Sequence, residues 1–182
     1  MLVTGGGRTV AAYDVANAVY PAEQWSPTTE TWTTLASMHA PRLYDSSALL
    51  LPDGRVLVSG GGRNPGPSPL DQLSAEIFAP PYLFKGPRPT ITSAPSVLTY
   101  NQAFTVTTPD AARITSAVLM PAGATTHGIN LSQRYVPLSF TTGTGQLTMR
   151  APVDSNLAPP GWYLLFLVND AGVPSIATLV QF

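Results

Sequence analysis

The chain has 182 residues and a formal net charge of −1, and only 10% of its side chains are charged. A soluble domain typically has about 25% charged residues, and no basic cluster is visible, so the sequence gives no electrostatic footprint for nucleic acid. It contains no cysteine, which excludes disulfides, thiolate metal sites and cysteine nucleophiles, and no apolar run approaches the ~20 residues of a membrane-spanning helix. Its 15 glycines and 19 prolines indicate an all-β protein, because short strands need many tight turns.

The N-terminal part of the chain contains a sequence repeat. Residues 2–8 (LVTGGGR) return as residues 57–63 (LVSGGGR), and residues 22–27 (AEQWSP) return as residues 75–80 (AEIFAP). The two offsets, 55 and 53 residues, agree closely. A period near 50 residues with a strand that ends in consecutive glycines predicts blades of a kelch-type β-propeller. Glycine is expected there because it permits close backbone approach and positive φ.

Six strands are expected in the repeat region, which amounts to about one and a half four-stranded blades. The turn Pro52-Asp53-Gly54-Arg55 lies between two apolar runs and therefore predicts a β-hairpin. The expected strands cover residues 1–5, 17–25, 31–36, 44–51, 55–60 and 74–79.

A proline-rich segment, residues 85–89, is expected to be a stiff linker, since it cannot continue a strand ladder. The predicted domains are therefore a propeller fragment over 1–84 and an immunoglobulin-like β-sandwich over 90–182. Residues 162–168 are apolar on both faces, which predicts a central strand. The expected sandwich strands cover residues 96–99, 103–108, 114–120, 134–140, 145–150, 162–168 and 174–181.

Several segments resemble the C-terminal part of galactose oxidase and of the related glyoxal-oxidase-type copper radical oxidases. Residues 42–56 (RLYDSSALLLPDGRV) are similar to the family's last-blade segment, in which a Tyr-His pair precedes the LLLPDGR run. Residues 126–130 (THGIN) resemble its histidine-bearing loop, and residues 160–166 and 169–175 resemble its C-terminal hairpin. The resemblance covers essentially the whole chain. It implies a partial kelch propeller followed by an immunoglobulin-like early-set domain.

The resemblance also implies a copper site, whose ligands in the family are two tyrosines and two histidines. Tyr44 is similar to the axial tyrosine, which takes the substrate proton in the family mechanism, and His127 is similar to the histidine that the sandwich supplies. Asp45 stands where the family has its other histidine. Because imidazole suits Cu(II) better than carboxylate does, copper binding is expected to be weak. The family's radical tyrosine is crosslinked to a cysteine, so this chain is expected to have no radical cofactor.

Each candidate residue also has a structural interpretation. His127 could be a solvated or backbone-bonded side chain, Tyr44 could cap a blade core, and Asp45 could accept hydrogen bonds from turn amides. His39 is the other imidazole of the chain and could replace the missing ligand. A set of aromatic side chains could either stack on sugar rings or pack the blades together: Tyr13, Tyr20, Trp25, Trp32 and Tyr82.

Two classes of function remain from the sequence. The chain is either a non-catalytic β-module that binds carbohydrate or protein, or part of a copper oxidase of alcohols or aldehydes that further blades complete. Asp45 and the lack of cysteine favour the non-catalytic module for the chain by itself. The family resemblance points to an extracellular protein, although no signal-peptide pattern is visible.

Open strand edges near Val3 and Ile77 predict self-association. The same expectation rests on blade faces that carry apolar side chains at Leu49, Leu51, Val56 and Val58.

Overall fold

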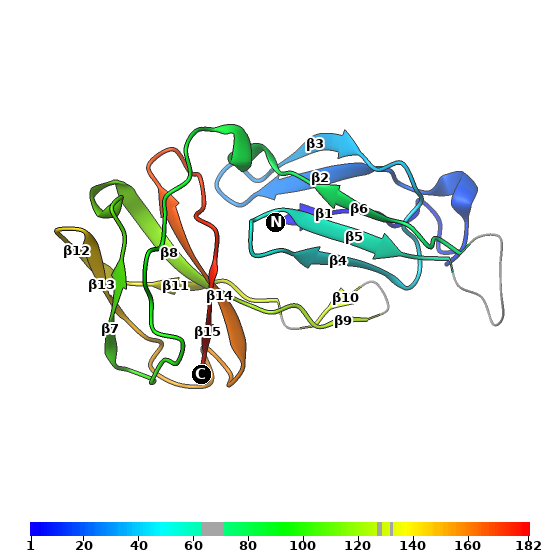
Figure 1. Ribbon diagram of the computed structural model, residues 1–182. Coiled ribbons are helices and arrows are strands. Elements are labelled where there is room, and N and C mark those ends of the chain that lie inside the picture. The colour runs from blue at the N-terminus through cyan, green and yellow to red at the C-terminus, as the bar shows by residue number, and fades with distance from the viewer. Residues whose placement is uncertain (63–70, 127–128, 132) are drawn as a thin grey trace. The chain divides into compact units, whose positions relative to one another are not determined.

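The computed structural model describes residues 1–62, 71–126, 129–131 and 133–182, and these are built almost entirely from β-strands (Figure 1). The described helical elements are short 3-10 turns: η1 (Val15–Asn17), η2 (Pro81–Phe84) and η3 (Ala111–Arg113). No described helix has the length and hydropathy that a membrane span requires. The all-β fold class predicted from composition is confirmed.

The chain divides into two compact units that do not follow the sequence order strictly. The first consists of Met1–Leu49, Val56–Phe78 and Ala124–Leu131, and the second of Leu50–Arg55, Ala79–Gly123 and Ser132–Phe182. The domain boundaries inferred from the sequence, 1–84 and 90–182, stay a prediction.

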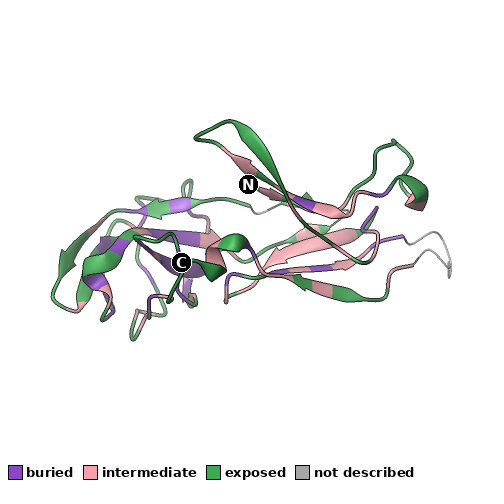
Figure 2. Cartoon of the chain, turned by 90° about the horizontal axis from the view of Figure 1, so that it is seen from above, coloured by how far each residue is buried: buried purple, intermediate pink, exposed green. Residues whose placement is uncertain are grey.

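The first unit contains two three-stranded antiparallel sheets, β1-β2-β3 and β4-β5-β6. The strands are β1 (Leu2–Val3), β2 (Pro21–Ser26), β3 (Thr31–Ser37), β4 (Ser46–Leu50), β5 (Val56–Gly60) and β6 (Ala75–Phe78). The outer strand β3 is exposed along most of its length (Figure 2).

The sequence repeat is also a repeat of strand register. In the first sheet Leu2 pairs with Gln24, and in the second sheet the equivalent Leu57 pairs with Ile77. The next pair repeats in the same way, since Val3 faces Glu23 and Val58 faces Glu76. The two halves of the repeat therefore form the same pair of antiparallel strands.

The second unit is a two-sheet β-sandwich, as predicted, with sheets β11-β8-β14-β15 and β12-β13-β7. Its strands are β7 (Ala103–Thr107), β8 (Ile114–Pro121), β11 (Val136–Leu138), β12 (Phe140–Gly143), β13 (Gln146–Arg150), β14 (Trp162–Asn169) and β15 (Thr178–Gln181). Two further short strands, β9 (Thr125–Thr126) and β10 (Ile129–Asn130), pair with each other and belong to the first unit.

Strand β14 is central, which confirms the prediction made from its two apolar faces. Tyr163, Leu165 and Leu167 lie in the main core between the sheets. On the opposite face Leu164 and Phe166 are buried in a smaller cluster. Both faces are covered, so burial on both sides accounts for the unbroken apolar run.

The strand expected over residues 96–99 is wrong: only Val97 forms a bridge there, parallel to Gln181. The Leu98 N–H donates to the Gln181 carbonyl over 2.8 Å, so the segment contacts the sheet briefly. It cannot continue as a strand because the backbone turns at Asn101, where φ is +57°.

The proline-rich segment 85–89 is fixed to the sandwich by hydrogen bonds. The Arg88 guanidinium donates to the carbonyls of Pro174 (2.9 Å) and Ser175 (2.6 Å). The Asn169 side-chain amide donates to the Pro87 carbonyl over 3.1 Å. These bonds hold the segment against the end of β14 and the turn that follows it.

The predicted hairpin turn at residues 52–55 is present between β4 and β5, with φ of +79° at Gly54. The Ala177 N–H donates to the Pro52 carbonyl over 2.8 Å, and the Tyr82 hydroxyl donates to the Gly54 carbonyl. This contact gives Tyr82 a packing role rather than an exposed one.

Candidate functional site

The segment of residues 42–45, which carries Tyr44 and Asp45, lies against both glycine runs of the repeat. The Gly6 N–H donates to the Arg42 carbonyl over 2.7 Å, and the Gly62 N–H donates to the Tyr44 carbonyl over 3.0 Å. Each repeat therefore holds one end of the segment through its backbone.

Close approach explains why these positions are glycine. A Cβ at Gly5 would lie 2.5 Å from the Arg42 carbonyl oxygen, and a Cβ at Gly60 would lie 2.9 Å from the Asp45 carbonyl oxygen. Both glycines also have positive φ, +73° and +72°. The repeated glycines bring the backbone close to the segment that carries the predicted site residues.

Tyr44 contacts Tyr13, whose hydroxyl has further oxygen-bearing side chains near it. The Tyr44 ring is 40% exposed and meets Tyr13 edge to face, with 5.8 Å between the ring centroids. Burial raises the pKa of the Tyr13 hydroxyl, and so, to a smaller degree, do Tyr44, Asp45 and Asp71. Tyr44, Asp45 and Asp71 therefore each act electrostatically on Tyr13. Asp45 adopts a left-handed conformation with φ of +59°.

Of the two histidines, the structure describes only His39. His127 lies outside the described residues; the strands on either side of it, β9 and β10, belong to the same compact unit as Tyr44. His39 is placed beside Glu76, with 3.0 Å between its Nδ1 and the Glu76 Oε2. The His39 side chain is otherwise 97% exposed, so the possibility that it replaces a ligand stays a prediction.

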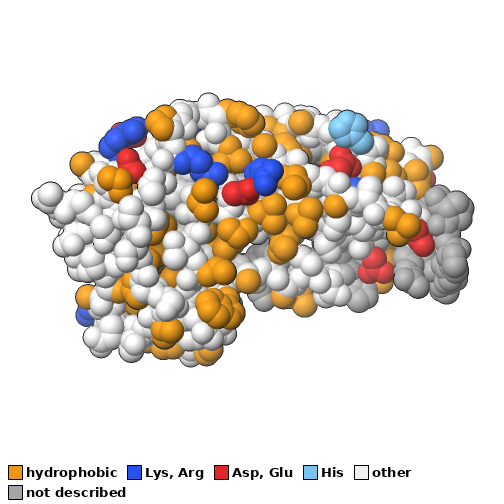
Figure 3. Space-filling model, viewed as in Figure 1, with side chains coloured by type: hydrophobic (Ala, Val, Ile, Leu, Met, Phe, Trp, Pro, Cys, Tyr) orange, Lys and Arg blue, Asp and Glu red, His pale blue; other side chains and the backbone are white. Residues whose placement is uncertain are grey.

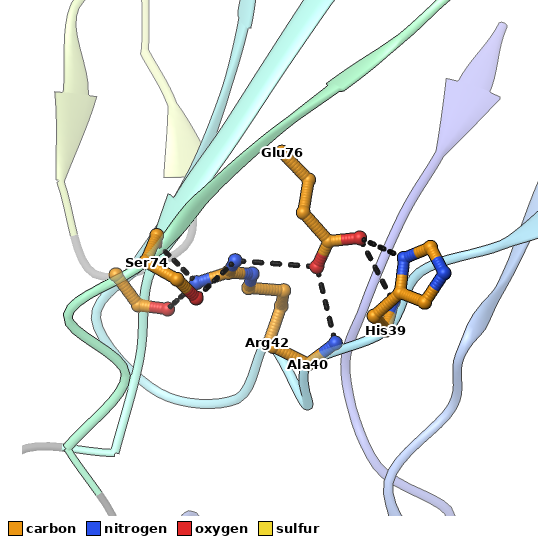
Figure 4. Close-up of polar contacts among 6 residues, drawn as sticks. His39, Ala40, Arg42, Ser74 and Glu76 are labelled. Atoms are coloured by element: carbon orange, nitrogen blue, oxygen red, sulfur yellow. Dashed lines mark hydrogen bonds and ion pairs between the residues drawn. The ribbon is translucent and has the colours of Figure 1, made fainter.

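Polar contacts of the Arg42 side chain hold the first residue of the segment 42–45 in place (Figure 4). The Arg42 side chain is 0% exposed and donates to the carbonyls of Gly60 (3.0 Å) and Ser74 (2.9 Å). It also donates to the Ser74 hydroxyl (3.1 Å) and to a Glu76 carboxylate oxygen (3.3 Å). A buried guanidinium needs such partners, because an uncompensated buried charge is strongly destabilising.

The Glu76 carboxylate accepts hydrogen bonds from the Arg42 side chain and from the backbone of residues 39 and 40. The backbone N–H of His39 donates over 2.8 Å and that of Ala40 over 3.0 Å. Led by the His39 amide, these donors and Arg42 lower the pKa of Glu76 from 4.5 to about 2, even though partial burial opposes the shift. The charged carboxylate thus links β6 to the chain just before Tyr44.

The sequence did not predict that four residues would lie at this segment or beside its neighbours, although Tyr13 was among the candidate aromatic residues. Tyr13 and Asp71 come from distant loops, and no motif marks either as a neighbour of Tyr44. A weak signal existed for the other two: Arg42 opens the family-like segment, and Glu76 repeats Glu23 in the internal repeat.

The side chains named so far near Tyr44 and Tyr13 offer oxygen donors. Tyrosine and carboxylate oxygens are hard ligands, whereas imidazole is a common ligand for Cu(II). Within the part of the chain that the structure describes, no three His, Cys, Asp or Glu side chains form a group that could hold a metal ion. Tyr13, Tyr44, Asp45 and Asp71 offer oxygen atoms, and none of these four described residues offers a side-chain nitrogen.

The chain is similar to known oxidases along its whole length. Residues 88–182 match the family described as Galactose oxidase-like, Early set domain. The chain is 35% identical over 187 residues to galactose oxidase of Gibberella zeae, covering 98% of this chain and 27% of that protein. It is 34% identical to the aldehyde oxidase GLOX1 of Arabidopsis thaliana, covering 85% of this chain and 28% of that protein.

A solved structure gives the same relationship. A fungal alcohol oxidase of the AA5 family, determined in complex with copper, matches with a TM-score of 0.91 and 29% identity. The match covers 99% of this chain and 39% of the other. The chain therefore spans less than half the length of each of these relatives.

Proposed function

Because the chain belongs to the galactose oxidase-like early set family, we propose that it is a C-terminal module of that type with a degenerate copper site and no oxidase activity of its own. The resemblance to the C-terminal region of galactose and glyoxal oxidases, first drawn from sequence, is confirmed. The early-set domain corresponds to the sandwich. The relatives reported above that are named oxidases are longer proteins. This chain spans 27% of the length of galactose oxidase of Gibberella zeae.

In this proposal the two sheets of the first unit are blades of a kelch-type propeller. The equal register of β1 with β2 and of β5 with β6 supports it. So do the glycine runs, which bring backbones close together beside residues 42–45.

The main support for a degenerate copper site is the identity of residue 45, which is aspartate. It follows Tyr44 where the family has histidine, and the groups that act on the neighbouring Tyr13 in the described residues, Tyr44, Asp45 and Asp71, carry oxygen rather than nitrogen. Tyr44, Asp45 and His127 would be the residues to hold copper, which in the family supplies the redox chemistry. Tyr44 would accept the proton of the substrate. Asp45 would lower the affinity for copper, because it supplies a carboxylate in place of an imidazole.

Replacing Asp45 by histidine is expected to tighten Cu(II) binding by about tenfold or more, because it restores a nitrogen ligand. The backbone should tolerate the change, since histidine is enriched with aspartate at left-handed positions. Calorimetric titration with Cu(II), together with the copper spectrum, measures the effect.

Glu30→His is a matched control, because Glu30 is also an exposed acidic residue with positive φ, +53°. It should leave copper affinity unchanged. Nanomolar affinity in the wild-type chain, or a tyrosyl radical absorption band, would refute the degenerate site.

A second candidate is that the chain supplies Tyr44 and His127 to an alcohol or aldehyde oxidase that further blades complete. Similarity to galactose oxidase over 98% of the chain favours it. Because this candidate needs further blades, the test is hydrogen peroxide release from galactose by a copper-loaded fusion of this chain to the preceding part of galactose oxidase of Gibberella zeae. Turnover that Tyr44→Phe abolishes would support this candidate over the non-catalytic module.

The chain is also expected to self-associate through open strand edges. Strands β1 and β6 each lie at the edge of a sheet, and Val3 and Ile77 on them are exposed. The expectation that Val56 and Val58 form an open apolar face is wrong, because both are buried in the folded chain. Unpaired edge N–H and C=O groups therefore remain the driving feature.

Light scattering after size exclusion is expected to give a mass above that of one chain, 19.2 kDa. Ile77→Lys places a charge on the β6 edge and should restore a single-chain mass. Val97→Lys, a charge at an exposed position of the sandwich, should leave the assembly intact. A monodisperse single-chain mass for the wild type at high concentration would contradict the proposal.

A further inference from the structure

The sandwich unit contains a hollow of about 410 Å³ that the copper-related residues do not use. It lies beside the edge strand β11 and the loop that follows β13, and residues from these two stretches line it. A volume of several hundred Å³ is within the range of sites for small ligands. Its lining residues are Arg134–Ser139, Arg150–Val153, Asn156 and Leu157.

The hollow is positively charged. Arg134 and Arg150 line it, and no aspartate or glutamate does. None of the four ion pairs in the described part of the chain involves either arginine. Only 10% of the residues are charged, and white and orange atoms cover most of the face in Figure 3. Two arginines that line one hollow therefore stand out in this chain.

The two arginines differ in how firmly they are held. The Arg134 guanidinium donates to the carbonyls of Leu157 (3.1 Å) and Asn156 (3.4 Å), which fixes it to the wall. The Arg150 side chain is exposed, and its guanidinium makes no hydrogen bond or ion pair within the described residues. The nearby acid, Asp154, uses its Oδ1 to accept from the backbone N–H groups of Asn156 and Leu157. Arg150 therefore has donors available for a ligand.

The rest of the hollow offers apolar surface. Tyr135, Val153 and Leu157 are each more than half exposed, whereas Val136 and Ala151 are buried beneath them. An amphipathic aromatic ring beside guanidinium donors suits a ligand that has both an apolar face and a carboxylate.

An added peptide strand is disfavoured at this edge. Pro137 sits in the middle of β11 and has no N–H to donate to a neighbouring strand. The next carbonyl, that of Ser139, already accepts from the Arg150 N–H over 3.1 Å. A peptide that adds to a sheet edge binds mainly through backbone hydrogen bonds. Few such bonds are open at β11, so this mode of binding is disfavoured.

We propose that this hollow binds an acidic sugar, a hexuronate residue within a short oligosaccharide. The carboxylate would receive hydrogen bonds from Arg150, with Arg134 contributing its fixed charge. The apolar face of the pyranose ring would lie on Tyr135 and its neighbours. The inference concerns the sandwich alone and does not depend on the copper site.

The test is calorimetric titration of the full chain with trigalacturonate, with galactotriose and tetraglutamate as comparison ligands. Trigalacturonate is expected to bind, and Arg150→Gln to weaken it by about tenfold, because a charge-assisted hydrogen bond is lost. Arg150→Lys should weaken it less, since the charge remains without the bidentate fork. Tyr135→Ala should also weaken binding while leaving the arginines in place.

Lys85→Gln is the matched control, because it removes one exposed positive charge elsewhere in the chain. It should leave the affinity for trigalacturonate within about twofold of the wild type. Equal loss in Lys85→Gln and Arg150→Gln would reduce the effect to net charge and overturn the site. Tetraglutamate or galactotriose binding as tightly as trigalacturonate, or no binding of trigalacturonate at millimolar concentration, would also overturn it.

Discussion

Replacing Glu76 by glutamine is expected to lower the free energy of unfolding at neutral pH by about 2 kcal/mol. The change keeps the shape of the side chain but removes the negative charge that faces the fully buried Arg42. Losing one partner of a fully buried pair costs ~3–5 kcal/mol. A smaller loss is expected here because the Glu76 side chain is 22% exposed. Part of the cost arises because the amide NH₂ would replace one carboxylate oxygen and so face the backbone N–H of either His39 or Ala40.

The effect should depend on pH in a defined direction. The folded chain lowers the pKa of Glu76 from 4.5 to about 2, so the charged carboxylate stabilises the fold above about pH 4.5. This contribution is lost as the pH falls from 4.5 toward 2. Other carboxyls with lowered pKa values, including Asp14, Asp53 and Asp170, contribute to acid sensitivity as well. The difference between wild type and variant isolates Glu76, and it should shrink as the pH falls.

Urea unfolding of both proteins between pH 7 and pH 3 measures that difference. Glu23→Gln is the matched control, because Glu23 occupies the equivalent place in the first repeat and takes part in no ion pair of the described chain. It should change stability by less than about 0.5 kcal/mol. A wild-type advantage that stays constant down to pH 3 would show that the Glu76 charge is not the source.

The repeat could be predicted because its information is local. Matching residues in the two copies have the same alternation and the same glycine endings, so they form strands with equal register. The turn at residues 52–55 and the central position of β14 could be predicted for the same reason. Where one turn or one apolar run determines an element, the sequence suffices.

The candidate site could be predicted only in part, because its remaining members come together through packing. Tyr44 and Asp45 were identified through the family-like segment, whereas Tyr13, which contacts Tyr44, and Asp71, which acts on Tyr13, come from separate loops. Arg42 meets Glu76 across 34 residues of sequence, a pairing that no local pattern encodes. The grouping of residues 124–131 with the first unit is equally non-local, since their neighbours in sequence belong to the sandwich.

Replacing Gly5 by alanine is expected to lower the free energy of unfolding by about 3–5 kcal/mol, more than Glu76→Gln does. A left-handed conformation alone costs a residue with a Cβ roughly 1–2 kcal/mol. At Gly5 the new Cβ would also lie 2.5 Å from the Arg42 carbonyl oxygen and 2.9 Å from the Arg42 Cβ. A backbone carbonyl cannot rotate away as a flexible side chain can, so the segment 42–45 would have to move.

Gly6 provides the matched control within the same glycine run. Its φ is +86°, but a Cβ there would meet nothing within 4 Å, so Gly6→Ala should show only the conformational cost. Gly60→Ala should resemble Gly5→Ala, because its Cβ would lie 2.9 Å from the Asp45 carbonyl oxygen at the other end of the segment. Urea unfolding should therefore separate Gly5 and Gly60 from Gly6 by about 2 kcal/mol. Equal losses at all three positions would mean that these glycines are needed for positive φ alone, and not to let both repeats approach the segment that carries Tyr44.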